Sequence, residues 1–143
     1  MTPLKIEQKE SIATRLAFIE TELSDFEKLK DTSWLTYQNS RDLRRNVERI
    51  CENLANACID IGKIILAGES IEMPESYRDV IRKLGEAKII PQKLSDDLSD
   101  LIIIRNILAH QYLDLKWDKI KSFLEKGSQI IKEFANIAQK MIS

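Results

Sequence analysis

The chain contains one histidine, His110, and Arg105 precedes it by five positions inside an apolar segment, residues 101–112. A histidine titrates near neutral pH, so its imidazole can take a proton from a ribose 2′-hydroxyl or give one to a leaving oxygen. An arginine can hold two phosphate oxygens and stabilise the charge that builds up as phosphorus is attacked. These two groups suffice for RNA cleavage, and the sequence offers no clustered carboxylates to hold magnesium. We therefore expect metal-independent chemistry, with no metal site and no cofactor.

Arg105 lies in the middle of a stripe that should face the core of the protein. At helical spacing the stripe comprises Leu94, Leu98, Leu101, Arg105, Leu108 and Tyr112. A guanidinium cannot lose its charge, and stripping it of water is costly unless it is paired or faces a solvated cleft. Asn106, the next residue, adds a polar group. The segment is therefore a candidate site.

In an unbroken helix Arg105 and His110 point in different directions, because five residues correspond to a rotation of roughly 140°. The two side chains can converge if the helix ends near His110. Alternatively, two copies of the helix meet across a symmetric dimer, so that both copies of each side chain line one cleft. We favour the homodimer, because the helix is apolar on more than one face.

Structural roles compete with this chemical interpretation. A lone histidine at a helix end is more often a cap or a satisfied core residue. Arg105 could form a buried ion pair with a residue of the preceding long helix, or with a nearby carboxylate, that of Asp96, Asp97 or Asp100. Asn106 could be an ordinary polar residue, and Tyr112 a core ring. Judged from chemistry alone, catalysis is the less common alternative.

Length and composition predict one all-α domain over residues 1–143, because three prolines and four glycines leave few helix breakers. The 22 basic and 23 acidic residues nearly balance, so any contact with a polyanion must be local. Cys51 and Cys58 should lie roughly 10 Å apart on one helical face, too far to bridge. With no signal peptide and no apolar run of membrane-spanning length, we expect a cytoplasmic protein that does not bind membranes.

Apolar periodicity predicts four long helices and one short helix. The long helices are expected over residues 6–29, from a start between Trp34 and Arg41 to Gly68, from Pro91 to about Ala109, and after a turn at residues 114–117. The short helix should begin near Tyr77 and be stopped by Gly85. In the last helix, Gly127 would permit a close helix approach. The simplest packing is an up-and-down four-helix bundle with one additional short helix.

Four arginines of the second long helix form a basic cluster, which comprises Arg41, Arg44, Arg45 and Arg49. The cluster could steer an RNA backbone toward the site. Equally, it could be a solvated face paired at helical spacing with Asp42, Glu48 and Glu52. Trp34 and Trp117 could stack bases, although such rings more often pack in a core or a dimer interface.

The segment Arg105-Asn-Ile-Leu-Ala-His110-Gln-Tyr112 resembles the Arg-x4-His-x-Tyr motif of the HEPN superfamily, in its HepT-like toxin branch. Further segments resemble that branch in order and spacing: Arg45-Asn-Val-Glu-Arg-Ile, Pro74-Glu-Ser-Tyr77, Leu84-Gly85-Glu-Ala and Ile90-Pro91. The resemblance extends roughly from Arg41 to Phe134 and assigns no role to residues 1–40. A bare Arg-x4-His would be a weak signal, whereas the ordered set is specific.

This resemblance implies a homodimeric α-helical ribonuclease, the toxin of a two-component system whose antitoxin is an MntA-like minimal nucleotidyltransferase. It implies that Arg105 and His110 are the catalytic pair and that Asn106 supports them. It also implies that the antitoxin attaches adenylate to Tyr112, which would put bulk and negative charge over the cleft. The substrate, tRNA or mRNA, stays open.

Two other functions remain open beside this one. A HEPN fold could bind a nucleotide or the nucleotidyltransferase without cleaving RNA. The chain could also be a helical dimerisation adaptor. The adaptor would show Arg105 fully paired to a carboxylate, with no open cleft at the interface.

Overall fold

The computed structural model describes residues 3–108 and 113–143, with side chains from residue 116 onward in the second range. The six helices in these ranges are α1 (Ile6–Leu29), α2 (Trp34–Asn39), α3 (Arg41–Gly68), α4 (Tyr77–Glu86), α5 (Gln92–Ile107) and α6 (Leu113–Ile142). No strand occurs in the described ranges. The prediction of an all-α protein is confirmed.

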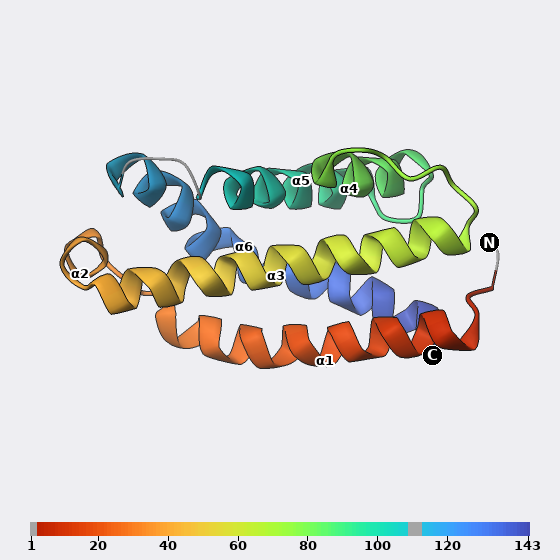
Figure 1. Cartoon of the computed structure of the whole chain (residues 1–143), viewed down its shortest axis with the longest axis horizontal. Coiled ribbons are helices and arrows are strands. Elements are labelled where there is room, and N and C mark those ends of the chain that lie inside the picture. Colours follow the sequence, from red (N-terminus) through yellow and green to blue (C-terminus); the bar gives the residue numbers. More distant parts are fainter. Residues whose placement is uncertain (1–2, 109–112) are drawn as a thin grey trace.

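The four helices of the bundle are α1, α3, α5 and α6 (Figure 1). α3 and α6 each pack against both α1 and α5, so α1 and α5 occupy opposite corners. The short α4 packs against α3 and α5, and the short α2 packs against α3 and α6. The predicted four-helix bundle is therefore confirmed, but it carries two short helices instead of one.

The second short helix exists because the chain breaks at Ser40. The backbone of Ser40 is extended, with φ -117° and ψ 105°, and its Oγ accepts a hydrogen bond from the Leu43 backbone at 3.2 Å. Ser33 caps α2 in the same way through the backbone N–H of Thr36. Serine side chains satisfy the free N–H groups of a helix start. A new helix therefore begins at Arg41, and the segment before it closes as a helix of its own.

The prediction that Gly85 stops the short helix is wrong. α4 continues through Gly85 to Glu86 and is closed by Lys88, whose φ is 60°, together with a hydrogen bond from the Ile89 backbone to the Leu84 carbonyl at 2.9 Å. Gly85 instead lets α4 and α5 approach, because a Cβ on it would lie 2.6 Å from the Cβ of Ser95. Its role is packing between helices.

Three further expectations differ in detail from the structure. Pro91 is the residue before α5 and not its first residue, and α5 ends at Ile107. α6 begins at Leu113, so the turn expected at residues 114–117 is absent. A Cβ on Gly127 would lie 2.7 Å from the ring of Phe123 on the same helix, so Gly127 makes room for that ring and not for a neighbouring helix.

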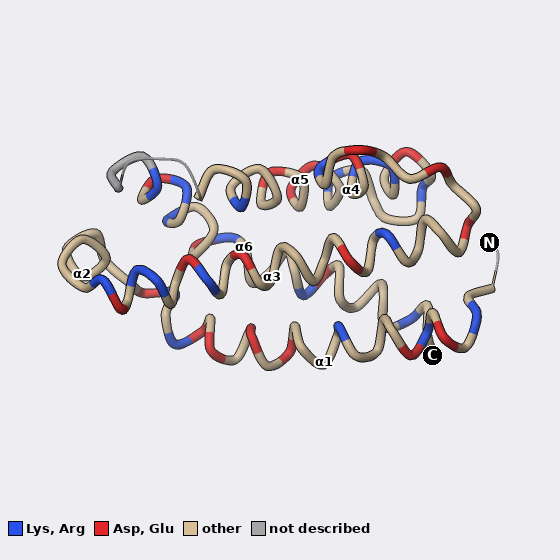
Figure 2. Tube along the Cα trace, in the orientation of Figure 1, with Lys and Arg blue, Asp and Glu red and all other residues tan. Residues whose placement is uncertain are grey.

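The core runs along the whole bundle, and its largest fully buried side chains include Phe26, Tyr37, Phe123 and Phe134. Cys51 and Cys58 are buried in this core as free thiols, as predicted. Burial raises the pKa of the Cys58 thiol to about 12. Basic and acidic residues both occur along α1 and α3 (Figure 2). Within the described ranges, none of the helices is both long and apolar enough for a membrane crossing.

Candidate functional site

Arg105 lies in the last turn of α5 and is held by two amide side chains. Its Nε donates a hydrogen bond to Oδ1 of Asn56 on α3 at 2.9 Å, and its Nη1 donates to Oδ1 of Asn106 at 3.0 Å. The positive charge also suits the C-terminal end of a helix. Both partners are neutral, so they orient the guanidinium without neutralising its charge.

The ring of Tyr77 forms another side of the same cluster. The guanidinium carbon of Arg105 lies 5.1 Å from the ring centre, and Nζ of Lys63 lies 4.7 Å from it. Both distances are typical of cation–π contacts. Tyr77 is the first residue of α4, which Ser76 caps by accepting a hydrogen bond from the Asp79 backbone at 3.1 Å. The cap therefore fixes where the ring sits.

The alternative in which Arg105 pairs with Asp96, Asp97 or Asp100 of its own helix is not seen in the described residues. Asp96 accepts a hydrogen bond from Gln92 at 2.9 Å, and Asp97 pairs with Lys93 at 3.0 Å. Among the described side chains, no carboxylate forms an ion pair with Arg105 or Lys63. The partner does come from α3, as one alternative anticipated, but it is an amide.

The cluster reaches solvent. Arg105 is half-buried, Asn106 is exposed, and the Tyr77 ring is 39% exposed. A groove of about 430 Å³ lies between α1 and α3. Asn56 lines this groove and also belongs to the Arg105 cluster. A plain helical adaptor would show Arg105 fully paired to a carboxylate, and the described side chains do not show such a pair.

His110 and Tyr112 lie outside the described residues, so the convergence of Arg105 with His110 stays a prediction. α5 ends at Ile107. The rotation of roughly 140° holds only for an unbroken helix that continues to His110, so it does not apply to this pair.

The predicted basic cluster on α3 is divided by the structure. Arg44 donates hydrogen bonds from Nη1 to the carbonyls of Tyr37 at 3.1 Å and Gln38 at 2.6 Å, so it closes the end of α2. The other three arginines, Arg41, Arg45 and Arg49, are exposed. The alternative in which these arginines pair with Asp42, Glu48 and Glu52 is not seen among the described side chains, and Glu48 instead pairs with Lys116 at 3.2 Å.

Trp34 and Trp117 pack together at one end of the bundle. Their ring centres lie 5.9 Å apart, and the Tyr37 ring lies 5.1 Å from that of Trp117. Tyr37 is fully buried, and both tryptophans are partly buried. The rings join α2 to α6, so the structure assigns them to packing.

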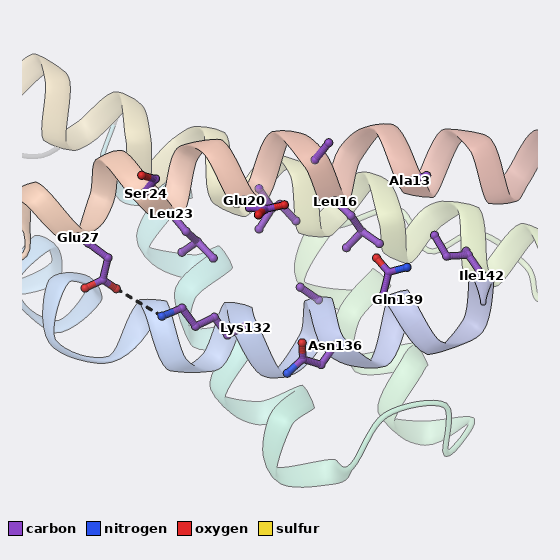
Figure 3. Close-up of a pocket in the computed structure, with 13 residues that line it drawn as sticks. Ala13, Leu16, Glu20, Leu23, Ser24, Glu27, Lys132, Asn136, Gln139 and Ile142 are labelled. Atoms are coloured by element: carbon purple, nitrogen blue, oxygen red, sulfur yellow. Dashed lines mark ion pairs between the residues drawn. The ribbon is translucent and has the colours of Figure 1, made fainter.

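A second groove, of about 550 Å³, lies between α1 and α6 (Figure 3). Leu16 and Leu23 contribute to its apolar lining, and Glu27 and Lys132 form an ion pair across it at 3.6 Å. None of its lining residues belongs to the Arg105 cluster.

Sequence reasoning did not identify Asn56, Lys63 and Tyr77 as members of the site. Asn56 and Lys63 are separated by seven residues, so both lie on one face of α3. That spacing of two polar residues beside an apolar stripe is the signal in the sequence. In the sequence, Tyr77 stands out only as the start of the short helix and as the end of the Pro74-Glu-Ser-Tyr77 segment.

Comparison with solved structures identifies the class of fold. A structure described as a tri-AMPylated Shewanella oneidensis HEPN toxin in complex with MNT antitoxin matches with a TM-score of 0.81 and 24% identity, over 91% of this chain and 97% of that one. The structure of YutE from Bacillus subtilis, described as a cytosolic protein of unknown function, matches with a TM-score of 0.74 and 26% identity, over 92% of this chain and 87% of that one. The fold is therefore that of HEPN proteins.

The family follows from the sequence match. A family model described as Ribonuclease HepT-like matches residues 19–139, and the chain belongs to this family. The mRNA nuclease HepT of Shewanella oneidensis is 32% identical over 92 residues, which are 64% of this chain and 66% of that protein. The tRNA nuclease HepT of Aphanizomenon flos-aquae is 28% identical over 106 residues, which are 73% of this chain and 71% of that protein. The match thus spans about two thirds of these relatives. At the level of the family, the predicted HepT-like ribonuclease is confirmed.

Proposed function

We propose that the protein is a metal-independent endoribonuclease, the toxin of a toxin–antitoxin pair, in which Arg105 and His110 cleave RNA. Membership of the HepT-like ribonuclease family supports the class of reaction. The observation that carries the proposal is the setting of Arg105, a half-buried guanidinium that two neutral amides hold without neutralising its charge. A guanidinium in that setting is ready to bind a phosphate.

The proposed reaction is a transesterification, in which a ribose 2′-hydroxyl attacks the phosphodiester on its own 3′-oxygen. His110 takes the proton of the 2′-hydroxyl, and the 2′-oxygen attacks phosphorus. The bond from phosphorus to the 5′-oxygen breaks, and that oxygen receives a proton from an imidazolium. Arg105 stabilises the charge on the non-bridging oxygens as the new bond forms. The products are a 2′,3′-cyclic phosphate and a 5′-hydroxyl.

The proposed regulation is nucleotidylation at Tyr112 by an MntA-like minimal nucleotidyltransferase antitoxin. Solved structures of the same fold are described as toxin–antitoxin complexes, and one of them is described as a tri-AMPylated HEPN toxin in complex with MNT antitoxin. Adenylate at Tyr112, two residues from His110, would offer Arg105 a phosphate in place of RNA. We propose further that the protein is a cytoplasmic homodimer, in keeping with the relative described as cytosolic, and that its substrate is tRNA or mRNA, as the names of two relatives indicate.

Growth inhibition by a His110→Ala variant tests the proposed catalysis. The variant should lose toxicity, because the imidazole that moves the proton is removed, while native mass measurement should show an unchanged oligomer. Arg82→Gln is a matched control, since Arg82 is an exposed arginine of α4 outside the cluster. Toxicity that survives His110→Ala would reject the mechanism.

The proposed regulation can be tested by incubating the protein with ATP and a minimal nucleotidyltransferase that is encoded next to it. The intact mass of the wild-type protein should rise in adenylate-sized steps, and Tyr112→Phe should show no gain. A Tyr112→Phe variant that gains the same mass would reject Tyr112 as the modified residue.

The alternative is a HEPN module that binds a nucleotide or the nucleotidyltransferase and cleaves nothing. One observation favours it: Arg105 and Lys63 share the Tyr77 ring, and such a pair can bind phosphate without any help from His110. This alternative predicts binding of adenine nucleotides while tRNA and mRNA stay whole at pH values on both sides of the histidine titration.

A further inference from the structure

We propose that Lys63 and Arg105 form a two-cation subsite on the ring of Tyr77, which binds an RNA phosphate next to the one that is cleaved. The inference rests on the proposed function and extends it, because it adds Lys63 and Tyr77 to the residues that recognise the substrate. Neither residue belongs to the Arg-x4-His-x-Tyr motif.

Three helices bring the two cations together. α3 supplies Asn56 and, two turns later on the same face, Lys63. Arg105 reaches from α5 to Asn56 through Nε, and its guanidinium carbon lies 5.1 Å from the Tyr77 ring centre. Nζ of Lys63 lies 4.7 Å from the same ring centre. The Tyr77 ring on α4 therefore contacts both cations.

The charge in this arrangement is not balanced. Several lysines of the bundle, but not all, pair with a carboxylate, as Lys93 does with Asp97 at 3.0 Å and Lys116 with Glu48 at 3.2 Å. Within the described ranges, neither Lys63 nor Arg105 has such a partner. Two like charges kept near each other repel, and an anion between or beside them relieves that repulsion.

The cluster is accessible from solvent. Tyr77 is 39% exposed, and Lys63 is only partly buried. An RNA strand carries a negative charge on every phosphate, so a chain that places one phosphate on Arg105 brings its neighbour close to the site. Lys63 offers a compact, rotatable donor for that second phosphate.

The salt dependence of RNA binding tests the subsite. Each neutralised phosphate of a single strand contributes about 0.7 to the slope of log affinity against log salt concentration. Lys63→Gln should therefore lower the slope for a non-cleavable 2′-O-methyl RNA by about 0.7 and weaken binding about fivefold at about 0.1 M salt. Lys63→Arg should restore the wild-type slope. Lys140→Gln, which removes an exposed lysine of α6, should leave the slope unchanged.

Two further variants separate the subsite from simple packing. Tyr77→Phe keeps the ring and should preserve the slope, whereas Tyr77→Leu should lower it as Lys63→Gln does. If Lys63 merely packs on Tyr77, then Lys63→Gln will lower Tm and leave the salt slope at the wild-type value, and the subsite is refuted. If Lys63→Gln leaves the slope unchanged but Arg105→Gln lowers it, the subsite is refuted and the proposed function is not. A wild-type protein that binds no RNA would refute the proposed function, and this subsite with it.

Discussion

Nε of Arg105, near the end of α5, donates a hydrogen bond to Oδ1 of Asn56 on α3 at 2.9 Å. The bond joins two elements of the bundle at the point where the candidate site lies. Asn56 accepts the bond through a neutral amide, so the guanidinium is positioned and keeps its full charge. A carboxylate in place of Asn56 would hold Arg105 more tightly and cancel the charge that a phosphate needs.

Substitutions at Asn56 should affect cleavage through Arg105. Hydrogen bonds to charged groups contribute about 1.5 to 3 kcal/mol, so Asn56→Ala should lower kcat about ten- to a hundredfold if that bond positions Arg105 in the transition state. Asn56→Asp should lower activity at least as much, because the new carboxylate competes with the phosphate. Initial rates on a fluorogenic RNA measure both effects.

Asn53→Ala is the matched control for Asn56. Asn53 lies on the same helix and donates its side-chain hydrogen bond to Glu22 of α1 at 3.3 Å, and not to the Arg105 cluster. Its substitution should leave kcat near the wild-type value. Equal losses in the two variants would contradict a specific role for Asn56.

The division of the basic cluster predicts two kinds of arginine variant. Arg44 binds the carbonyls of Tyr37 and Gln38, so Arg44→Gln should lower the free energy of unfolding, by about 1 to 3 kcal/mol, in a urea titration. Arg45→Gln should leave stability within about 0.5 kcal/mol of wild type, because Arg45 is an exposed surface residue. If Arg45 contacts an RNA backbone, its loss will instead lower the salt dependence of binding. A stability loss in Arg45→Gln equal to that in Arg44→Gln would contradict this division.

Gly85 should tolerate no larger side chain. Its Cβ position lies 2.6 Å from both Cβ and Oγ of Ser95, so Gly85→Ala must push α4 away from α5. Overpacking of this kind costs about 1 to 3 kcal/mol, measurable by urea unfolding. Ser95→Gly in the same chain should recover part of the loss, because it removes the clashing atoms. A Gly85→Ala protein as stable as wild type would show that the helices are not in tight contact.

Glu27 should contribute to stability at neutral pH and lose that contribution in acid. Hydrogen bonds from Ser128 at 2.7 Å and Lys30 at 2.9 Å, with the charge of Lys132, lower the pKa of Glu27 from 4.5 to about 2. A carboxylate whose pKa is depressed by folding stabilises the fold above its unfolded pKa, and that stability is lost as pH falls from about 4.5 to 2. Glu27→Gln should therefore be less stable than wild type at neutral pH, and the two should converge in acid.

Urea midpoints between pH 2 and 7 check the prediction for Glu27. Glu20→Gln is a suitable control, since Glu20 lines the same groove on α1 and forms no ion pair with a described residue (Figure 3). A difference between wild type and Glu27→Gln that does not shrink toward pH 2 would contradict the assignment.

The helices of the bundle were predictable because each has an apolar stripe of helical period, as on α1 from Ile12 to Phe26. The boundary at Ser40 was harder to predict, because residues 35–40 show no clear period and the break depends on a serine cap. Gly85 and Gly127 were misassigned for a different reason. A glycine that ends a helix and a glycine that admits a neighbour look alike until Ser95 or Phe123 is in place beside it.

The site was predictable only where its residues depart from the pattern of their own helix. Arg105 stands out because it interrupts an apolar stripe, and Asn106 follows it directly. Asn56 and Lys63 are ordinary polar residues of α3 in the sequence, and only the packing of α5 and α4 against that helix joins them to Arg105 and Tyr77. The periodicity of one helix does not show which residue of another helix it contacts. The partner of Arg105 could therefore be identified only from the three-dimensional structure.

The chemistry of the cleaved RNA ends tests the central claim most directly. We expect mass spectrometry of RNA incubated with the purified protein in excess EDTA to show a 2′,3′-cyclic phosphate and a 5′-hydroxyl. These products should disappear with Arg105→Gln and with His110→Ala, and they should persist with Arg82→Gln. Ends bearing a 3′-hydroxyl and a 5′-phosphate, or cleavage that continues undiminished in both the Arg105 and His110 variants, would contradict the account.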